Sequence, residues 1–192
     1  MKLDLLFEKY PYLESEDLVL KKIEHEDIDQ FYALCSDDVL FKYKPGKAKN
    51  NIKSVDNMID HYERDFNKRK MLFLGIYLKS EAMKLIGLGE VFDFDKKASV
   101  VTFGYTINQD YWGKGYATMY STMVLDYLFG TIEVNRVQAF VMPENKKSHQ
   151  VLERCGFIKE GTIRQGHVWK DKGVVDLTLY SMLKDEFIGR ST

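Results

Sequence analysis

A stretch of small residues between an apolar run and a helical pattern is the part of this sequence best suited to chemistry. The β-prone run 100–107 precedes a loop that contains Gly113, Gly115 and Ala117, and a helical pattern then continues to Phe129. Glycine lets a backbone approach a ligand closely. The first N–H groups of a helix lack partners within the helix, and the helix dipole favours negative charge there. The order strand, glycine loop, helix therefore predicts a site for a diphosphate.

Two familiar phosphate motifs fit this loop poorly. The loop of nucleoside triphosphatases needs a glycine five residues before Gly113, where Asn108 stands. It also needs Ser or Thr after Lys114, where the sequence has Gly115. The dinucleotide fingerprint needs a third glycine at the position of Thr118. A dinucleotide oxidoreductase is therefore disfavoured, and a titration with NAD would test it.

Two motifs together resemble one enzyme family. Residues 112–118, WGKGYAT, are similar to the acetyl-CoA loop of the GNAT acyltransferases, whose pattern is Gln/Arg-x-x-Gly-x-Gly/Ala. Gly115 and Ala117 take the small positions, and Trp112 replaces the usual first residue. This replacement is common in the branch that resembles the ribosomal-protein N-acetyltransferases (RimJ/RimL-like). The family's second motif follows in the expected order and spacing at residues 145–157, NKKSHQVLERCGF.

The resemblance implies acetyl-CoA as cosubstrate and no metal. It covers roughly residues 18–183 and is tightest over 103–157. It also implies that the strand 100–107 splays from its neighbour, so that its last backbone groups bind the pantetheine amides; ordinary ladder pairing is the alternative there. Lys114 either contacts a phosphate or is solvated. The residues implied to bind acetyl-CoA are Tyr105, Thr106, Ile107, Trp112, Gly113, Lys114, Gly115, Tyr116, Ala117, Thr118, Asn145 and Ser148.

The helix after Pro143 supplies the groups expected near the thioester. Asn145 is a good helix cap, and the resemblance implies that it also faces the pantetheine arm. Ser148 lies one turn later on the same helix face. In the resembled branch a serine here is proposed to protonate the leaving thiolate, and the alternative is a small polar residue that packs against the cofactor without proton transfer.

The general base is harder to assign. Many family members carry a glutamate on the strand 100–107, but this sequence has Thr102 at that position, which cannot take up a proton. Glu90 and His167 are the candidate replacements. Histidine has an ordinary pKa of about 6.5, which suits proton transfer near neutral pH. Both residues could equally be solvated groups, and a water chain without a dedicated base is a further alternative.

The bulk properties exclude several classes of function. The 192 residues predict a single domain, 1–192, with an N-terminal lead at 1–16. The net charge of −1 favours neither nucleic acid nor membrane as a partner. No apolar run approaches the about 18 residues of a membrane span, and we expect a cytoplasmic protein. Cys35 and Cys155 are expected to be reduced, buried thiols, and the four histidines lack metal-ligand spacing.

The hydrophobic pattern predicts a mixed α/β (α+β) fold around one twisted sheet. We expect about seven strands, about four helices and the splayed strands that the GNAT resemblance implies at the cofactor site. Gly87 and Gly89 indicate a bulge or a close backbone approach within their strand. The helix after the glycine loop is expected to pack through Met119, Met123, Leu125, Tyr127 and Leu128. Strands are expected at 18–23, 71–78, 85–94, 100–107, 136–141, 157–165 and 174–183, helices at 24–37, at 54–67, from after Thr118 to Phe129 and at 144–154, and a turn at 170–173.

The leading function is transfer of an acetyl group from acetyl-CoA to a primary amine, either a protein N-terminus or a small molecule such as a polyamine or aminoglycoside. We expect the acceptor cleft at residues 45–67 and 165–173. The basic loop 42–49 is either solvated or a rim over the substrate. The acidic residues Asp56, Asp60, Glu63 and Asp171 either attract a cationic acceptor or are simply solvated.

A second class of function is a CoA-binding or sensing module with a protein partner and little turnover, which Thr102 motivates. Thiol release with a panel of amines would discriminate between this module and the enzyme. A homodimer through an edge strand or the terminal hairpin is also possible.

Overall fold

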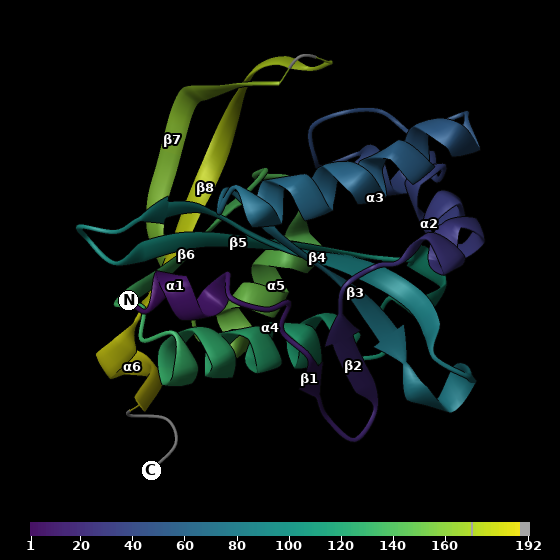
Figure 1. Ribbon diagram of the computed structural model, residues 1–192. Coiled ribbons are helices and arrows are strands. Elements are labelled where there is room, and N and C mark those ends of the chain that lie inside the picture. The colour runs from purple at the N-terminus through teal and green to yellow at the C-terminus, as the bar shows by residue number, and fades with distance from the viewer. Residues whose placement is uncertain (170, 189–192) are drawn as a thin grey trace.

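The computed structural model describes residues 1–169 and 171–188. Within them, six α-helices surround one eight-stranded sheet with the order β1-β2-β3-β4-β5-β6-β8-β7 (Figure 1). Neighbouring strands are antiparallel except β5 and β6, which are parallel. The strands are β1 (Leu13–Glu14), β2 (Leu18–Lys21), β3 (Leu72–Leu78), β4 (Lys84–Asp95), β5 (Val100–Ile107), β6 (Arg136–Val141), β7 (Ile158–Trp169) and β8 (Gly173–Leu183).

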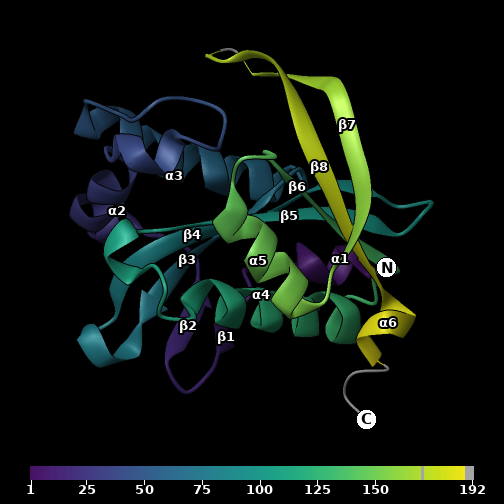
Figure 2. The same ribbon diagram turned by 180° about the vertical axis from the view of Figure 1, so that it is seen from behind.

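The helices cover both faces of the sheet. Helices α2 and α3 lie on one face, and α1, α4 and α5 lie on the other, as the two opposite views show (Figures 1 and 2). The long β7–β8 hairpin rises past the sheet on the side of α3. The helices are α1 (Leu3–Leu6), α2 (Ile28–Cys35), α3 (Ile52–Asn67), α4 (Tyr116–Asp126), α5 (Lys146–Cys155) and α6 (Lys184–Ile188).

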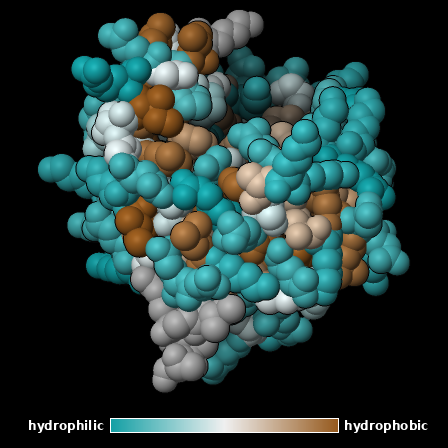
Figure 3. All heavy atoms as spheres, turned by 90° about the vertical axis from the view of Figure 1, so that its left-hand side faces the viewer, coloured by the Kyte–Doolittle hydropathy of each residue, from teal (hydrophilic) through white to brown (hydrophobic). Residues whose placement is uncertain are grey.

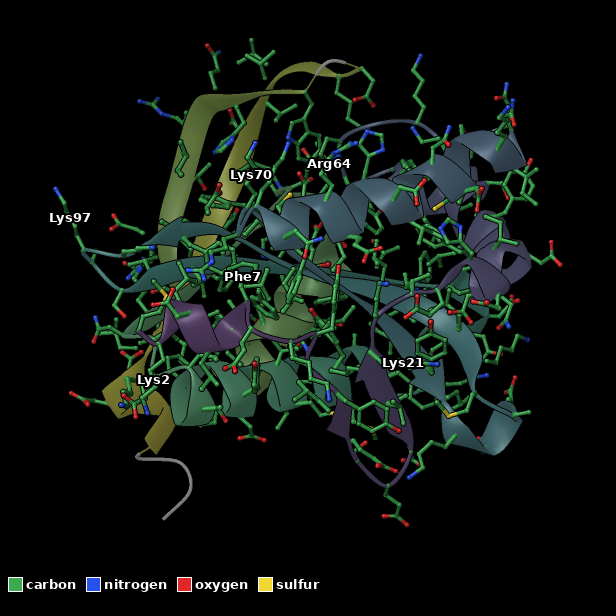
Figure 4. All side chains as sticks on the ribbon, in the orientation of Figure 1. Lys2, Phe7, Lys21, Arg64, Lys70 and Lys97 are labelled. Carbon is green, nitrogen blue, oxygen red and sulfur yellow. The ribbon has the colours of Figure 1, made fainter. Side chains whose placement is uncertain are left out.

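Two hydrophobic cores fill the space between these layers. Strand β3 is buried along its whole length because its side chains alternate between the two cores. Phe73 and Tyr77 pack with residues of α2 and α3 such as Phe31, whereas Leu74 belongs to the core under α1, α4 and α5. Phe7, which follows α1, belongs to the core under α1, α4 and α5 (Figure 4). Its ring centroid lies 5.2 Å from those of both Phe66 and Phe94.

The predicted elements are all present, and several short ones were not predicted. Helix α1 and strand β1 fall within the expected N-terminal lead, and α6 follows the last strand. The predicted helix 24–37 begins as a 3-10 turn, His25–Asp27, before α2. The strand predicted to end at Gln165 continues to Trp169. The predicted turn 170–173 includes Lys170, which lies outside the described residues.

The glycines of β4 do mark close backbone approaches. A Cβ atom on Gly89 would lie 2.2 Å from the ring of Tyr120, and one on Gly87 would lie 2.5 Å from the carbonyl oxygen of Thr106. The Tyr120 hydroxyl donates a hydrogen bond to the carbonyl of Gly104 at 3.0 Å. Helix α4 can therefore sit directly on the sheet because β4 has no side chain at position 89.

The face that α4 presents to the sheet includes the predicted residues and two others, Tyr120 and Val124. The stripe Tyr120, Val124 and Leu128 is fully buried, whereas Met119 and Met123 lie at its margins. These three residues recur at four-residue spacing, so they share one helix face. The predicted packing is confirmed, because Leu125 and Leu128 are buried and Met119, Met123 and Tyr127 pack against the same core. The central position of the Tyr120 ring against Gly89 was not predicted.

The two cysteines have different surroundings. Cys35 is buried, and burial raises the pKa of its thiol to about 11, as expected for an unreactive thiol. Cys155 is only partly buried, with its Sγ atom 4.0 Å from the carbonyl oxygen of Thr118. In the described part of the chain, no helix is both long enough and apolar enough to cross a membrane.

Candidate active site

The sheet opens between β5 and β6. Their pairing runs only from Val100 with Arg136 to Thr102 with Gln138. Beyond Thr102, β5 continues to Ile107 and pairs with β4 alone. The predicted splay is thus confirmed in the fold, and it leaves a cavity of about 290 Å³ beside it. The cavity lining includes Glu90, Thr102, Tyr105, Asn145, Ser148 and His167.

The glycine loop lies between the end of β5 and the start of α4. Gly113 and Gly115 have φ angles of 76° and 88°, a left-handed conformation that favours glycine. Among the described residues, apart from the adjoining ones, no atom lies within 4 Å of the position that a Cβ atom would take at either glycine. Gly115 is the N-cap residue of α4, and no side chain caps the helix there. The first N–H groups of α4 therefore have no side-chain cap, which is the local arrangement that an anion site at a helix N-terminus requires.

Trp112 fixes this loop to its surroundings. Its indole N–H donates a hydrogen bond to the carbonyl of Ile107 at 2.7 Å, and the Nζ atom of Lys147 lies 4.0 Å from the ring centroid. The Ile107 carbonyl, one of the groups expected to meet the pantetheine, therefore already accepts one hydrogen bond. Lys114 lies with its Nζ atom 5.0 Å from the ring centroid of Tyr111. Tyr116, Ala117 and Thr118 form the first turn of α4 behind the loop.

The start of α5 positions Ser148. The Asn145 side chain caps the helix by accepting a hydrogen bond from the Ser148 N–H at 3.3 Å, as predicted. The Asn145 amide also donates to the Ser148 Oγ atom at 2.9 Å. The serine oxygen thus accepts a hydrogen bond, and its own proton can point into the cavity. Gly156, with a φ angle of 81°, ends this helix.

The Tyr105 side chain is a feature that the sequence did not reveal. Among the described residues its buried hydroxyl has no hydrogen-bond partner. Burial raises the pKa of Tyr105 to about 12, and the nearby Ser148 hydroxyl opposes this shift although it lies outside hydrogen-bond geometry. The Tyr105 ring packs edge-on against Tyr120 at 5.8 Å. The cavity therefore contains a phenol that stays protonated at neutral pH beside the serine.

Glu90 and Lys44 lie on the other side of β5. Glu90 packs against Gly104, where a Cβ atom would come within 2.8 Å of the Glu90 Oε1 atom. Burial raises the pKa of Glu90, and the charge of Lys44 opposes this shift. Burial also lowers the pKa of Lys44. The Lys44 Nζ atom donates to the Thr106 Oγ1 atom at 3.3 Å and lies 4.2 Å from the ring centroid of Phe41.

A bulge in β7 brings His167 to the same cavity. The register of β7 against β8 shifts between Ile163 and His167, and Gln165 has a φ angle of 50°. A bulge of this kind redirects the side chains that follow it. The His167 ring lies 5.2 Å from that of Phe140 and lines the cavity. The structure thus brings together Glu90, Ser148 and His167, the three side chains predicted to be catalytic.

The Thr102 side chain holds β5 and β6 together. Its side chain is 1% exposed, and its Oγ1 atom accepts a hydrogen bond from the Gln138 amide at 3.1 Å. This contact joins β5 to β6 at the last paired position before the splay. The residue that stands where many relatives have a glutamate therefore secures the top of the opening.

The acidic residues expected near the acceptor are engaged elsewhere. Asp56 and Asp60 contact the His25 ring at 2.6 and 3.1 Å on the surface of α3, and Glu63 contacts Lys22 at 3.4 Å. None of the three lines the cavity. Helix α3 therefore does not form the expected wall of the cleft, and the solvated interpretation of its acidic face is the better one.

Two residues of the β7–β8 turn hold the loop between α2 and α3 over the cavity. Asp171 accepts a hydrogen bond from the Gly46 N–H at 3.0 Å. The Lys172 Nζ atom donates to the carbonyls of Phe41 and Lys44 at 3.1 and 3.0 Å. The two segments expected to form the acceptor cleft thus meet, although the loop contributes residues 43–45 rather than α3.

Comparison with known proteins agrees with this geometry. The family model described as the acetyltransferase (GNAT) domain matches residues 17–158. The probable N-acetyltransferase YjcK of Bacillus subtilis is 31% identical over 166 residues, which cover 84% of this chain and 86% of that protein. The uncharacterized N-acetyltransferase YoaA of the same organism is 26% identical over 91% of this chain and 98% of that protein.

Solved structures share the fold. RimJ of Mycobacterium smegmatis, in complex with CoA-disulfide, has a TM-score of 0.79 and 19% identity, and the match covers 95% of this chain and 94% of RimJ. The strand splay beside a glycine loop, the family match over 17–158 and the relatives named above agree. The chain belongs to the GNAT family of N-acetyltransferases, enzymes that use acetyl-CoA.

Proposed function

We propose that this enzyme transfers the acetyl group to a primary amine, either a protein N-terminal amine or a small-molecule amine, by direct attack on the thioester. The observation that carries the proposal is the convergence of Glu90, Ser148 and His167 on one cavity at the splay of β5 from β6. The glycine loop lies at the end of the same strand. A ligand whose diphosphate sits at Gly115 can then extend its arm along β5 into the cavity.

The cavity residues divide the proton transfers between two sides of β5. On one side Glu90 and His167 can accept a proton from the incoming ammonium, and the raised pKa of buried Glu90 makes it a stronger base than a surface carboxylate. The amine nitrogen then bonds to the carbonyl carbon and the carbon–sulfur bond breaks. On the other side Ser148, with Tyr105 beside it, can give a proton to the thiolate.

Release of free thiol tests this proposal directly. Purified protein is incubated with acetyl-CoA and a panel of amines that includes N-terminal peptides, polyamines and aminoglycosides. We expect acceptor-dependent thiol release with at least one class. Tight acetyl-CoA binding without thiol release for any amine would favour the CoA-binding module instead. The observation that supports this module is Thr102, whose hydroxyl is engaged by the Gln138 amide.

His167→Ala is expected to lower kcat by about 10²- to 10⁴-fold, the usual contribution of a general base, with a smaller rise in the acceptor KM. The reason is that the ring lines the same cavity as Glu90 and Ser148. The measurement is a pH–rate profile of kcat/KM. His61→Ala is the matched control, because His61 is exposed on α3, does not line the cavity, and forms a hydrogen bond with the Asn57 carbonyl of its own helix at 2.7 Å. An unchanged profile in His167→Ala would remove this residue from the mechanism.

The β7–β8 hairpin also supports the proposal of a homodimer. Strand β7 is an edge of the sheet. Val168 and Val174, which are paired across the hairpin, are 77% and 58% exposed. Figure 3 shows apolar residues among hydrophilic ones on the side of the molecule that the hairpin occupies.

Val168→Lys is expected to give a monomer in sedimentation analysis if the hairpin forms the interface. The proposal would be contradicted if the wild-type protein itself sedimented as a monomer.

A further inference from the structure

Lys44 differs from the other lysines of its loop. The loop between α2 and α3 carries four lysines, and Lys42 and Lys47 are exposed. Lys44 instead points inward, with its Nζ atom on Thr106 and above the ring of Phe41. Burial lowers its pKa, so its amine is uncharged more often than that of a surface lysine. It therefore combines an inward position with greater nucleophilicity.

The surroundings of the Lys44 amine are those of a binding site for a primary amine. They offer a hydroxyl acceptor at Thr106, an aromatic face at Phe41 and the nearby charge of Glu90. An aromatic face and a carboxylate are the features that attract an ammonium group. Lys44 and Glu90 both line the cavity that contains Ser148. The chain thus supplies its own amine to the place where an external amine is expected.

The backbone of Lys44 is held in this position from the far end of the chain. Lys172 donates a hydrogen bond to the Lys44 carbonyl at 3.0 Å, and its own amine is paired with Asp171 at 2.7 Å. Asp171 in turn accepts a hydrogen bond from Gly46. Holding a nucleophile near a reacting group raises its effective concentration strongly. The β7–β8 turn therefore fixes the backbone from which the Lys44 side chain reaches into the cavity.

We propose that Lys44 is a self-acetylation site, at which the enzyme transfers the acetyl group of acetyl-CoA to its own Lys44 Nζ atom when no external acceptor is present. This inference rests on the proposed function. The uncharged amine attacks the thioester carbonyl carbon, a nitrogen–carbon bond forms and the carbon–sulfur bond breaks. The amine gives up one proton to Glu90 or water, and the leaving thiolate takes one up to become CoA. The product is an uncharged amide in place of the Lys44 ammonium.

Peptide mass spectrometry tests the inference. Full-length protein is incubated with acetyl-CoA and no amine, then digested and mapped. We expect a gain of one acetyl group per chain on Lys44, at a first-order rate that is independent of protein concentration, as intramolecular transfer requires. Lys44→Arg is expected to lose the label, whereas Lys42→Arg and Lys47→Arg are expected to keep it. Gly115→Glu, which should not bind acetyl-CoA, is expected to remain unlabelled.

The other outcomes overturn the inference in distinguishable ways. Equal labelling of Lys42, Lys44 and Lys47, unaffected by Gly115→Glu, would show plain chemical acetylation of surface amines. An unlabelled Lys44 in protein that releases thiol with an external amine would overturn self-acetylation and leave the proposed function in place. An unlabelled Lys44 together with no thiol release for any amine would overturn both.

Discussion

Gly115→Glu is expected to abolish acetyl-CoA binding. Gly115 is the N-cap residue of α4, with a φ angle of 88° that is unfavourable for any side chain. A glutamate would extend from an open position at the start of the helix and place a negative charge where we propose that the phosphates bind. We expect a loss of about a hundredfold or more in affinity, roughly 3 kcal/mol, in calorimetric titration.

Two further variants separate the causes of this loss. Gly130→Glu adds the same charge at an exposed glycine beyond the other end of α4, where no atom lies within 4 Å of a Cβ position, and it is expected to bind acetyl-CoA normally. Gly115→Ala adds a methyl group and backbone strain without charge, so its loss should be much smaller. Wild-type affinity in Gly115→Glu would show that the diphosphate does not sit at this loop.

Gly89→Val is expected to have the largest effect on stability. The Cβ atom would lie 2.2 Å from the ring of Tyr120. That ring is fully buried, its hydroxyl is anchored on the Gly104 carbonyl, and Tyr105 packs against it. It therefore has little room to move. Overpacking of a well-packed core costs about 1–3 kcal/mol and occasionally more. We expect Gly89→Val to lower the free energy of unfolding by more than about 3 kcal/mol. Gly89→Ala is expected to lower it by an amount within that range.

The measurement is the free energy of unfolding from urea titration. Gly130→Ala is the matched control, because its new methyl group meets no atom within 4 Å. A surface change of this kind is usually worth less than about 0.5 kcal/mol. The Gly89→Val protein could instead be soluble and unfold at the same urea concentration as Gly130→Ala. That result would show that α4 does not pack on β4 as described.

The sequence was most informative where hydrophobic periodicity extended over a whole element. All seven predicted strands are present, and Asn145 caps α5 as expected. The short elements α1, β1 and α6 were missed because four, two and five residues are too few to show a period. The central position of Tyr120 on α4 was missed because it depends on Gly89, a glycine of another strand.

The candidate site divides in the same way. The glycine loop and the α5 cap are local, so consecutive residues encode them. The inward turn of Lys44 depends on a hydrogen bond from Lys172, which is 128 residues away. The isolated phenol of Tyr105 depends on burial among α4 and α5. No pattern in a single sequence reports contacts of this length, so the surroundings of these two side chains could be identified only in the folded chain.

The short seam between β5 and β6 has a consequence for the molecule as a whole. Only three residue pairs join the strands β1–β5 to the strands β6–β8 across the sheet. Beyond these three pairs, β5 and β6, which the structure describes in full, form no backbone hydrogen bonds with each other. The amides of an extended pantetheine arm could form hydrogen bonds with the strand edges there. The substrate would then act as a temporary strand that bridges two halves of the protein, and the departure of CoA would reopen the gap.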